Sequence, residues 1–135
     1  MMLPAAQSDF RSASSRRPQV LLVEDDARVR RSLQLLLEGE GFCVRAFAGA
    51  AALLADESAT DAACLVTDYR LGEQDGISLL RAMRRVGWSG PAILMTAFMT
   101  SGVAARATRE GFAQLFEKPF SPHLLIEALG RILAP

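Results

Sequence analysis

The stretch Leu65-Val66-Thr67-Asp68-Tyr69-Arg70, near the middle of the chain, decides the fold that the flanking sequence must adopt. Its apolar and β-branched residues run directly into an aspartate, and Gly72 and Gly76 follow as turn residues. Strands that are covered on both faces of a sheet have this continuous apolar form. We therefore predict a buried strand that ends by presenting the carboxylate of Asp68 to a crevice.

Three other stretches of the chain have the same form. Residues 20–23 are followed by Glu24-Asp25-Asp26, residues 93–95 by Thr96, and residues 115–117 by Lys118. In an open α/β sheet, ligands bind at the edge formed by the carboxyl ends of the strands. We expect acids, a hydroxyl and an ammonium to meet at that edge.

Helical patterns separate these strands along the whole chain. Strands are predicted at residues 19–23, 42–47, 63–67, 92–95 and 112–116, and helices at 27–39, 50–57, from 76, at 101–110 and from 122. Ser121 followed by Pro122 is typical of a helix start. The alternation predicts an α/β fold, a doubly wound parallel sheet of five strands covered on both faces by five helices.

Length and composition fit one domain with a short tail. The chain has 135 residues, half of them apolar, and a formal net charge of zero. Residues 1–18 lack an apolar period, so we expect a flexible N-terminal tail followed by a domain at residues 19–135. The charge gives no reason to expect nucleic acid or a membrane as a partner, and no segment looks like a signal peptide. Cys43 and Cys64 are predicted to be buried free thiols, as suits a cytoplasmic protein.

The acidic residues predict a bound cation. If Asp25 and Asp68 end neighbouring strands, two carboxylates about 4 Å apart repel each other by roughly 4 kcal/mol at an effective dielectric constant of about 20. Mg²⁺ suits such an all-oxygen site and keeps waters that a phosphate can replace. Lys118 is the only lysine among the basic residues of the chain, and it is a compact charge. With Thr96, it would offset the charge of a phosphoryl group carried by an aspartate.

These residues resemble the receiver domain of bacterial two-component response regulators. The resemblance covers residues 19–133 and depends on four motifs that occur in the family's order and spacing, each at a predicted strand end. The motifs are Val23-Glu24-Asp25-Asp26, Thr67-Asp68-Tyr69-Arg70-Leu71 with Asp75-Gly76, Met95-Thr96-Ala97, and Glu117-Lys118-Pro119-Phe120. The resemblance implies a flavodoxin-like sheet with strand order 2-1-3-4-5.

The resemblance also implies a Mg²⁺-dependent phosphoacceptor. Asp68 would take the phosphoryl group from the phosphohistidine of a histidine kinase or a phosphotransfer protein. Glu24, Asp25, Asp68 and the backbone carbonyl of Arg70 would hold Mg²⁺, with Mn²⁺ as an alternative. Asp26 is instead predicted to be the acid at the start of a helix, where the helix dipole favours it.

Thr96 and Lys118 would then bind oxygens of the phosphoryl group, and the Lys118–Pro119 bond is expected to be cis. Phosphorylation of Asp68 would thereby alter the face made by residues 101–110, 112–116 and the last helix. A phosphorylation-dependent homodimer is one expected outcome. The implied protein is a signalling switch that assists its own phosphorylation and dephosphorylation, not an enzyme.

Four positions depart from the family pattern or tune it. Leu115 stands where the family has an aromatic residue that moves with the switch threonine, and Gly72 stands where proline is common. Arg70 and Phe98 flank the phosphoryl group in the family. We expect Phe98 to hinder an attacking water and Arg70 to contact the phosphoryl oxygens.

Two other functions remain open from the sequence. A receiver that binds partners without phosphorylation is favoured by Leu115 and Gly72 but opposed by the intact acids, Thr96 and Lys118. A phosphatase of the haloacid dehalogenase kind uses similar residues. However, its nucleophile lies in a DxD motif on the first strand with a threonine after it, and here Glu24-Asp25-Asp26 precedes Ala27.

Overall fold

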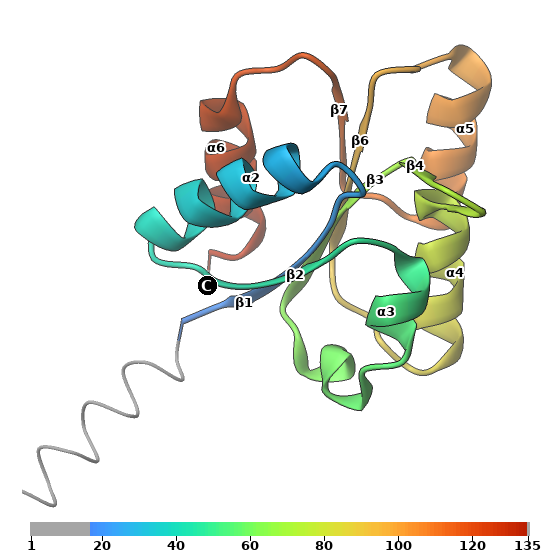
Figure 1. The fold of residues 1–135 in the computed structure, drawn as a ribbon. Helices are drawn as coiled ribbons and strands as arrows, with labels where there is room; N and C mark the ends of the chain where they lie inside the picture. Colours follow the sequence, from blue (N-terminus) through green and yellow to red (C-terminus); the bar gives the residue numbers. More distant parts are fainter. Residues whose placement is uncertain (1–16, 135) are drawn as a thin grey trace, which may run out of the picture.

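Five parallel strands form one sheet in the order β2-β1-β3-β6-β7 (Figure 1). They are β1 (Gln19–Val23), β2 (Cys43–Phe47), β3 (Cys64–Asp68), β6 (Ala92–Thr96) and β7 (Gln114–Glu117). Counted in the chain order of these five strands, this is the 2-1-3-4-5 order that the resemblance implied, and that prediction is confirmed. The computed structural model describes residues 17–134. The tail predicted at 1–18 lies outside the described residues, except for its last two.

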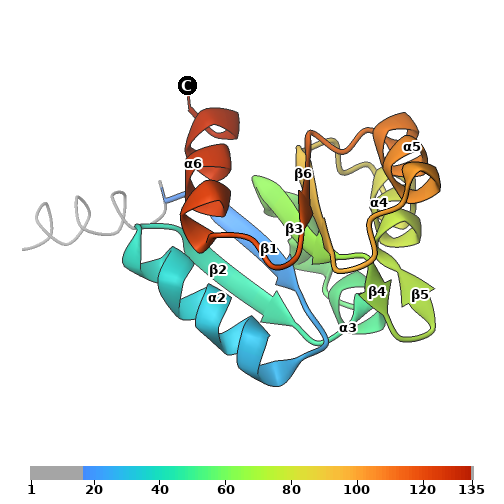
Figure 2. The same ribbon diagram turned by 90° about the horizontal axis from the view of Figure 1, so that it is seen from above.

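Helices cover both faces of the sheet, as Figure 2 shows. One face carries α2 (Ala27–Gly39) and α6 (Pro122–Ile132), and the other carries α3 (Ala50–Leu54), α4 (Gly76–Arg85) and α5 (Ser101–Glu110). Alternation along the strands sends Leu65 and Leu94 to the second layer and Val66 and Ile93 to the first, all of them fully buried. Burial of each such side chain contributes about 1.5–3 kcal/mol. The predicted fold class is therefore confirmed.

Polar side chains begin most of the helices and so set where the loops at the sheet edge end. Four caps accept a backbone N–H of the first turn: Asp26 for α2, Asp75 for α4, Thr100 for α5 and Ser121 for α6. Each cap satisfies an N–H that the helix itself leaves unpaired, which contributes about 1 kcal/mol. The predictions that Asp26 and Ser121 start helices are confirmed.

A short hairpin that the sequence analysis did not predict follows β3. Its strands, β4 (Arg70–Leu71) and β5 (Gln74–Asp75), pair antiparallel around Gly72, whose φ of +80° favours glycine. The chain then turns directly into α4 at Gly76. A Cβ atom on Gly76 would lie only 2.4 Å from the carbonyl oxygen of Asp68. The absence of a side chain at Gly76 therefore lets α4 pack against the backbone of Asp68.

Two local predictions were wrong. The helix predicted at 50–57 ends at Leu54, and a 3₁₀ helix, η1 (Glu57–Asp61), follows because Asp56 caps the N–H of Ser58 instead. Cys43 is exposed, since it begins β2 at the edge of the sheet. Cys64 is a buried free thiol as predicted, and burial raises its pKa to about 12.

Trp88, which is only 3% exposed, lies beside the amino ends of β3 and β6. Its indole N–H donates to the carbonyl oxygen of Ala62 at 2.8 Å. The guanidinium of Arg84 donates to the carbonyl oxygens of Trp88 and Gly90 at 3.2 and 2.7 Å. This part of the amino end is therefore packed and hydrogen-bonded.

Candidate functional site

Three carboxylates meet at the carboxyl edge of the sheet. β1 and β3 pair in a register that sets Val23 beside Thr67, so Glu24, which follows β1, and Asp68, which ends β3, are neighbours. Glu24, Asp25 and Asp68 each place a carboxylate oxygen within 4.8 Å of the other two. Glu24 and Asp68 are buried, whereas Asp25 is exposed. The structure thus brings together the acids that the sequence predicts to be metal ligands.

Lys118 joins two of these acids. Its Nζ donates to Oε1 of Glu24 at 2.7 Å and to Oδ2 of Asp68 at 2.6 Å. The register of β7 against β6 directs it there, because the N–H of Lys118 donates to the carbonyl oxygen of Thr96 at 2.8 Å. The Lys118–Pro119 bond is cis, as expected from the resemblance. Burial disfavours the charged ammonium, but the two carboxylates outweigh it and the pKa of Lys118 is raised.

Glu24 is buried and hydrogen-bonded through both its side chain and its backbone. Its side chain is only 1% exposed, and its second carboxylate oxygen accepts the backbone N–H of Asp26 at 3.2 Å. Arg30 donates to its carbonyl oxygen at 2.8 Å. Burial raises the pKa of the Glu24 carboxyl, and the hydrogen bond from Lys118 offsets part of that rise. Burial of the Glu24 carboxylate therefore costs free energy, and a nearby cation reduces that cost.

The hydroxyl of Thr96 lies buried at the end of β6. Its oxygen accepts the backbone N–H of Phe98 at 3.0 Å, so in this conformation it is engaged by its own loop. Thr96 is on the strand next to Asp68, because Asp68 pairs with Met95 in the register of β3 and β6. Turning this hydroxyl towards Asp68 would remove the acceptor of the Phe98 N–H in the 97–100 loop.

Arg70 and Phe98 form the outer wall of the site. The guanidinium of Arg70 lies over the ring of Phe98, with its carbon 3.9 Å from the ring centre. Such a stack is worth about 0.5–1 kcal/mol at an exposed site. The N–H of Arg70 also donates to Oδ1 of Asp68 at 3.2 Å. With the acids and Lys118, this pair lines a cavity of about 260 Å³. The family resemblance implied that both residues lie near the site, but it gave no sign that they contact each other.

Leu115 and Phe116 point to opposite faces of β7, as strand alternation predicts. Leu115 is half-buried against the layer of α3, α4 and α5. Phe116 packs on the other layer, where its ring stacks on Phe120 with ring centres 5.0 Å apart. No aromatic ring on β7 therefore lies on the side of α5.

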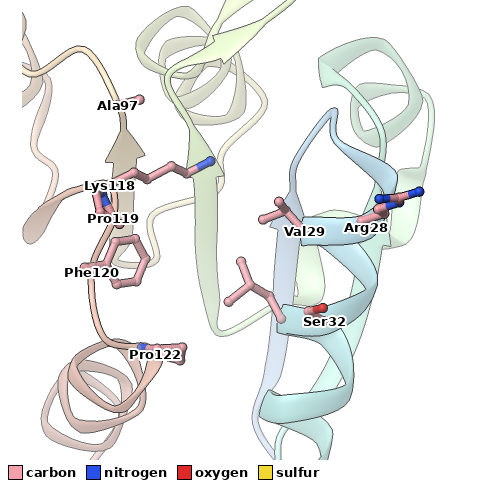
Figure 3. A pocket seen from close by; sticks show the side chains of 9 residues that line it. Arg28, Val29, Ser32, Ala97, Lys118, Pro119, Phe120 and Pro122 are labelled. Carbon is pink, nitrogen blue, oxygen red and sulfur yellow. The ribbon is translucent and has the colours of Figure 1, made fainter.

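An apolar groove of about 580 Å³ adjoins the acidic cavity and was not predicted from the sequence. Figure 3 shows side chains of α2, including Val29, across from Pro119 and Phe120 on the connection to α6 and from Pro122 at the start of that helix. Lys118 lines both the groove and the cavity. The groove combines two segments that are about ninety positions apart, so no local pattern could have indicated it.

The fold and the site define a class of protein: a doubly wound α/β domain with an acidic cleft, a lysine and a threonine at the carboxyl edge of its sheet. A family model described as the response regulator receiver domain matches residues 20–130. The chain therefore belongs to the response regulator receiver domain family. Proteins of this family are signalling switches of two-component systems and interact with histidine kinases or phosphotransfer proteins.

Named relatives agree with this assignment. The chain is 34% identical to the transcriptional regulatory protein FixJ of Rhizobium meliloti over 112 residues, which cover 83% of this chain and 55% of FixJ. It is 33% identical to the C4-dicarboxylate transport transcriptional regulatory protein DctD of the same organism, over 84% of this chain and 25% of DctD. The chain thus spans between a quarter and just over half of the length of these curated relatives.

Solved structures give the same fold. The structure of FixJ-N superimposes with a TM-score of 0.76 at 34% identity, covering 87% of this chain and 94% of that one. The chemotaxis protein CheY4 of Vibrio cholerae superimposes with a TM-score of 0.80 at 22% identity, covering 87% and 99%. Within residues 17–134, no helix has the length and apolar character needed to cross a membrane.

Proposed function

We propose that this receiver domain takes a phosphoryl group onto a carboxylate oxygen of Asp68 from a histidine kinase or a phosphotransfer protein. The observation that carries the proposal is the ammonium of Lys118, held within 2.7 Å of oxygens of both Asp68 and Glu24. A half-buried lysine that bridges two acids keeps positive charge where a phosphoryl group on Asp68 would place its oxygens. Residues 19–135 would act as the receiver domain, with residues 1–18 as a separate segment.

The reaction would proceed as a displacement at phosphorus. A carboxylate oxygen of Asp68 forms a bond to the phosphorus while the bond to the histidine nitrogen breaks, and the imidazole leaves with the electron pair of that bond. The ammonium of Lys118 stays within the cleft and offsets the charge of the transferred group. The Arg70 and Phe98 side chains cover the outer side and restrict access of water to the acyl phosphate.

The donor set fits Mg²⁺, with Mn²⁺ as an alternative. Asp25, Asp68, Glu24 and the backbone carbonyl of Arg70 would hold the ion, since all of them offer oxygen and three already lie within 4.8 Å of one another. When bound, the ion would supply positive charge beside the phosphoryl oxygens. Asp25 is the exposed member of the trio and would be the ligand that the ion meets first.

Phosphorylation would act as a switch through Thr96. A phosphoryl oxygen on Asp68 offers the Thr96 hydroxyl a charged acceptor in place of its present contact with the N–H of Phe98. The loop that carries Phe98 leads directly into α5, so the face made by α5, β7 and α6 would change. A phosphorylation-dependent homodimer through this face is one readout. The phosphoryl group can shift the equilibrium only by binding the two arrangements differently.

Incubation with Mg²⁺ and acetyl phosphate tests the proposal. We expect the mass of the domain to rise by one phosphoryl group, and Asp68→Ala to abolish the gain. Asp26→Ala is the matched control, because Asp26 lines the same cavity but its carboxylate caps α2. Labelling that persists in Asp68→Ala would move the acceptor to another residue. No labelling of the wild-type domain would instead favour the phosphorylation-independent receiver, which Leu115 slightly supports. The family match does not favour the phosphatase alternative.

A further inference from the structure

The helix that follows the switch loop is held weakly by apolar packing. Of the ten residues of α5, all of them described, only Ala107 is buried, and Val103 is half-buried. A buried alanine contributes much less than a leucine, because it removes much less apolar surface from water. Polar contacts therefore contribute a substantial part of what holds α5 in position.

Two arginines connect α5 to α4 and to the segment that directly follows β3. Arg106 on α5 donates to the hydroxyl of Tyr69 at 3.2 Å, and its other terminal nitrogen lies 3.6 Å from a carboxylate oxygen of Asp75. Nearer the end of α5, Glu110 accepts two hydrogen bonds from Arg81, at 3.1 and 3.2 Å. Of these two contacts, only that of Arg106 involves a residue next to the acidic cleft, because Tyr69 directly follows Asp68.

Tyr69 is well placed to link the cleft to α5. It directly follows Asp68, and its backbone is fixed on both sides: its N–H donates to Met95 at 2.8 Å and its carbonyl accepts from Gly76 at 2.7 Å. Alternation along the chain sends its side chain to the face opposite that of Asp68, against the layer of α4 and α5. The hydroxyl is thus a fixed acceptor at the end of the strand that carries Asp68.

We propose that Arg106 is a positioning residue that holds α5, and with it the loop from Thr96, in the arrangement seen here through its contacts with Tyr69 and Asp75. The inference depends on the proposed phosphorylation of Asp68 and adds a part of its regulation. The loop from Thr96 reaches α5 after four residues, 97–100. When the Thr96 hydroxyl turns towards Asp68, the N–H of Phe98 in this loop loses its acceptor. A loop movement that follows would be transmitted to α5 and opposed by the Arg106 contacts. Because Leu115 has no hydroxyl, the polar contact on this side of the sheet comes from Tyr69.

The binding of beryllofluoride in Mg²⁺ buffer, measured by calorimetry, tests this role. We expect Arg106→Ala to bind beryllofluoride roughly fivefold more tightly than the wild-type domain, since a partly exposed charged hydrogen bond no longer opposes the switch. Arg109→Ala is the matched control on the same helix, exposed and on the next turn, and should leave the affinity unchanged. A residue that only stabilised the fold would, when removed, leave the affinity equal or weaker. Equal or weaker binding by Arg106→Ala would therefore overturn the inference.

Tyr69→Phe removes a single oxygen and keeps the ring, so it tests the same contact in a variant that should fold. We expect it to tighten beryllofluoride binding as well, and the double variant to gain little beyond Arg106→Ala alone. Additive effects of the two substitutions would show that Arg106 does not act through Tyr69.

Hydrogen exchange without Mg²⁺ separates this inference from the proposed function. The amides of α5 should exchange faster in Arg106→Ala and Tyr69→Phe than in Arg109→Ala, and those of α2 should not. If the wild-type domain fails to bind beryllofluoride, the proposed function is wrong and exchange still reports on the contact. If the wild-type domain binds it but α5 exchanges equally in all three variants, the role of Arg106 is refuted alone.

Discussion

Replacement of Lys118 by methionine tests the electrostatics on which the site depends. The substitution keeps an unbranched apolar stem and removes the ammonium that contacts Glu24 and Asp68. Loss of one partner from a buried ion pair typically costs about 3–5 kcal/mol, because the other charge is left without compensation. For each acid this cost has an upper limit, because a carboxyl group takes up a proton once its charged form costs more free energy than protonation does.

That limit can be worked out for Glu24. From an ordinary pKa of 4.5, protonation at pH 7 costs at most about 3.4 kcal/mol. The Lys118 side chain is 23% exposed, so water will replace part of its contribution. We therefore expect Lys118→Met to lower the free energy of unfolding by about 2–3 kcal/mol at pH 7 in Mg²⁺-free buffer. Urea denaturation measures this loss, and Glu117→Gln, an exposed neighbour, is the control.

The loss should depend on pH in a defined direction. Burial already raises the pKa of Glu24, and removal of Lys118 raises it further. A carboxyl with a raised folded pKa stabilises the fold while it is protonated, and this contribution is lost as the pH rises through that pKa. At pH 5 the limit for Glu24 is only about 0.7 kcal/mol, so the effect of Lys118→Met should shrink between pH 7 and pH 5. A loss below about 1 kcal/mol at pH 7, or an equal loss at both pH values, would refute this account of the site.

Three further predictions concern residues other than Lys118. Phe98→Ala should speed hydrolysis of the acyl phosphate several-fold, as followed by the decay of the phosphorylated mass, because the Arg70 stack no longer covers the cleft. Trp88→Ala should cost about 3–5 kcal/mol in urea denaturation yet leave beryllofluoride affinity of the folded domain unchanged, since Trp88 lies at the other end of the sheet. Gly76→Ala should cost roughly 1–3 kcal/mol by the same assay, because its Cβ would meet the carbonyl oxygen of Asp68.

The gathering of acids at one edge could be predicted because it follows from strand register. Each of the residues Glu24, Asp68, Thr96 and Lys118 ends or follows an apolar strand, so a parallel sheet must bring them to the same edge. The strand order itself came from the family resemblance, since an alternation of strands and helices does not specify which strands are neighbours. The exposure of Cys43 was missed for this reason: it follows from the place of β2 at the sheet edge.

Contacts between side chains of distant segments could not be predicted. The stack of Arg70 on Phe98, the hydrogen bond of Arg106 to Tyr69 and the groove beside Lys118 each join residues on different elements. Local pattern specifies which face of an element is apolar, because the periods of strands and helices are properties of the backbone. It does not specify which polar side chains meet across elements, because that depends on helix position and on rotamers that only the packed structure selects. The sequence thus determined the helices, the strands and the gathering of acids at one edge of the sheet. Tertiary packing determined which side chains line that edge and which contacts connect it to α5.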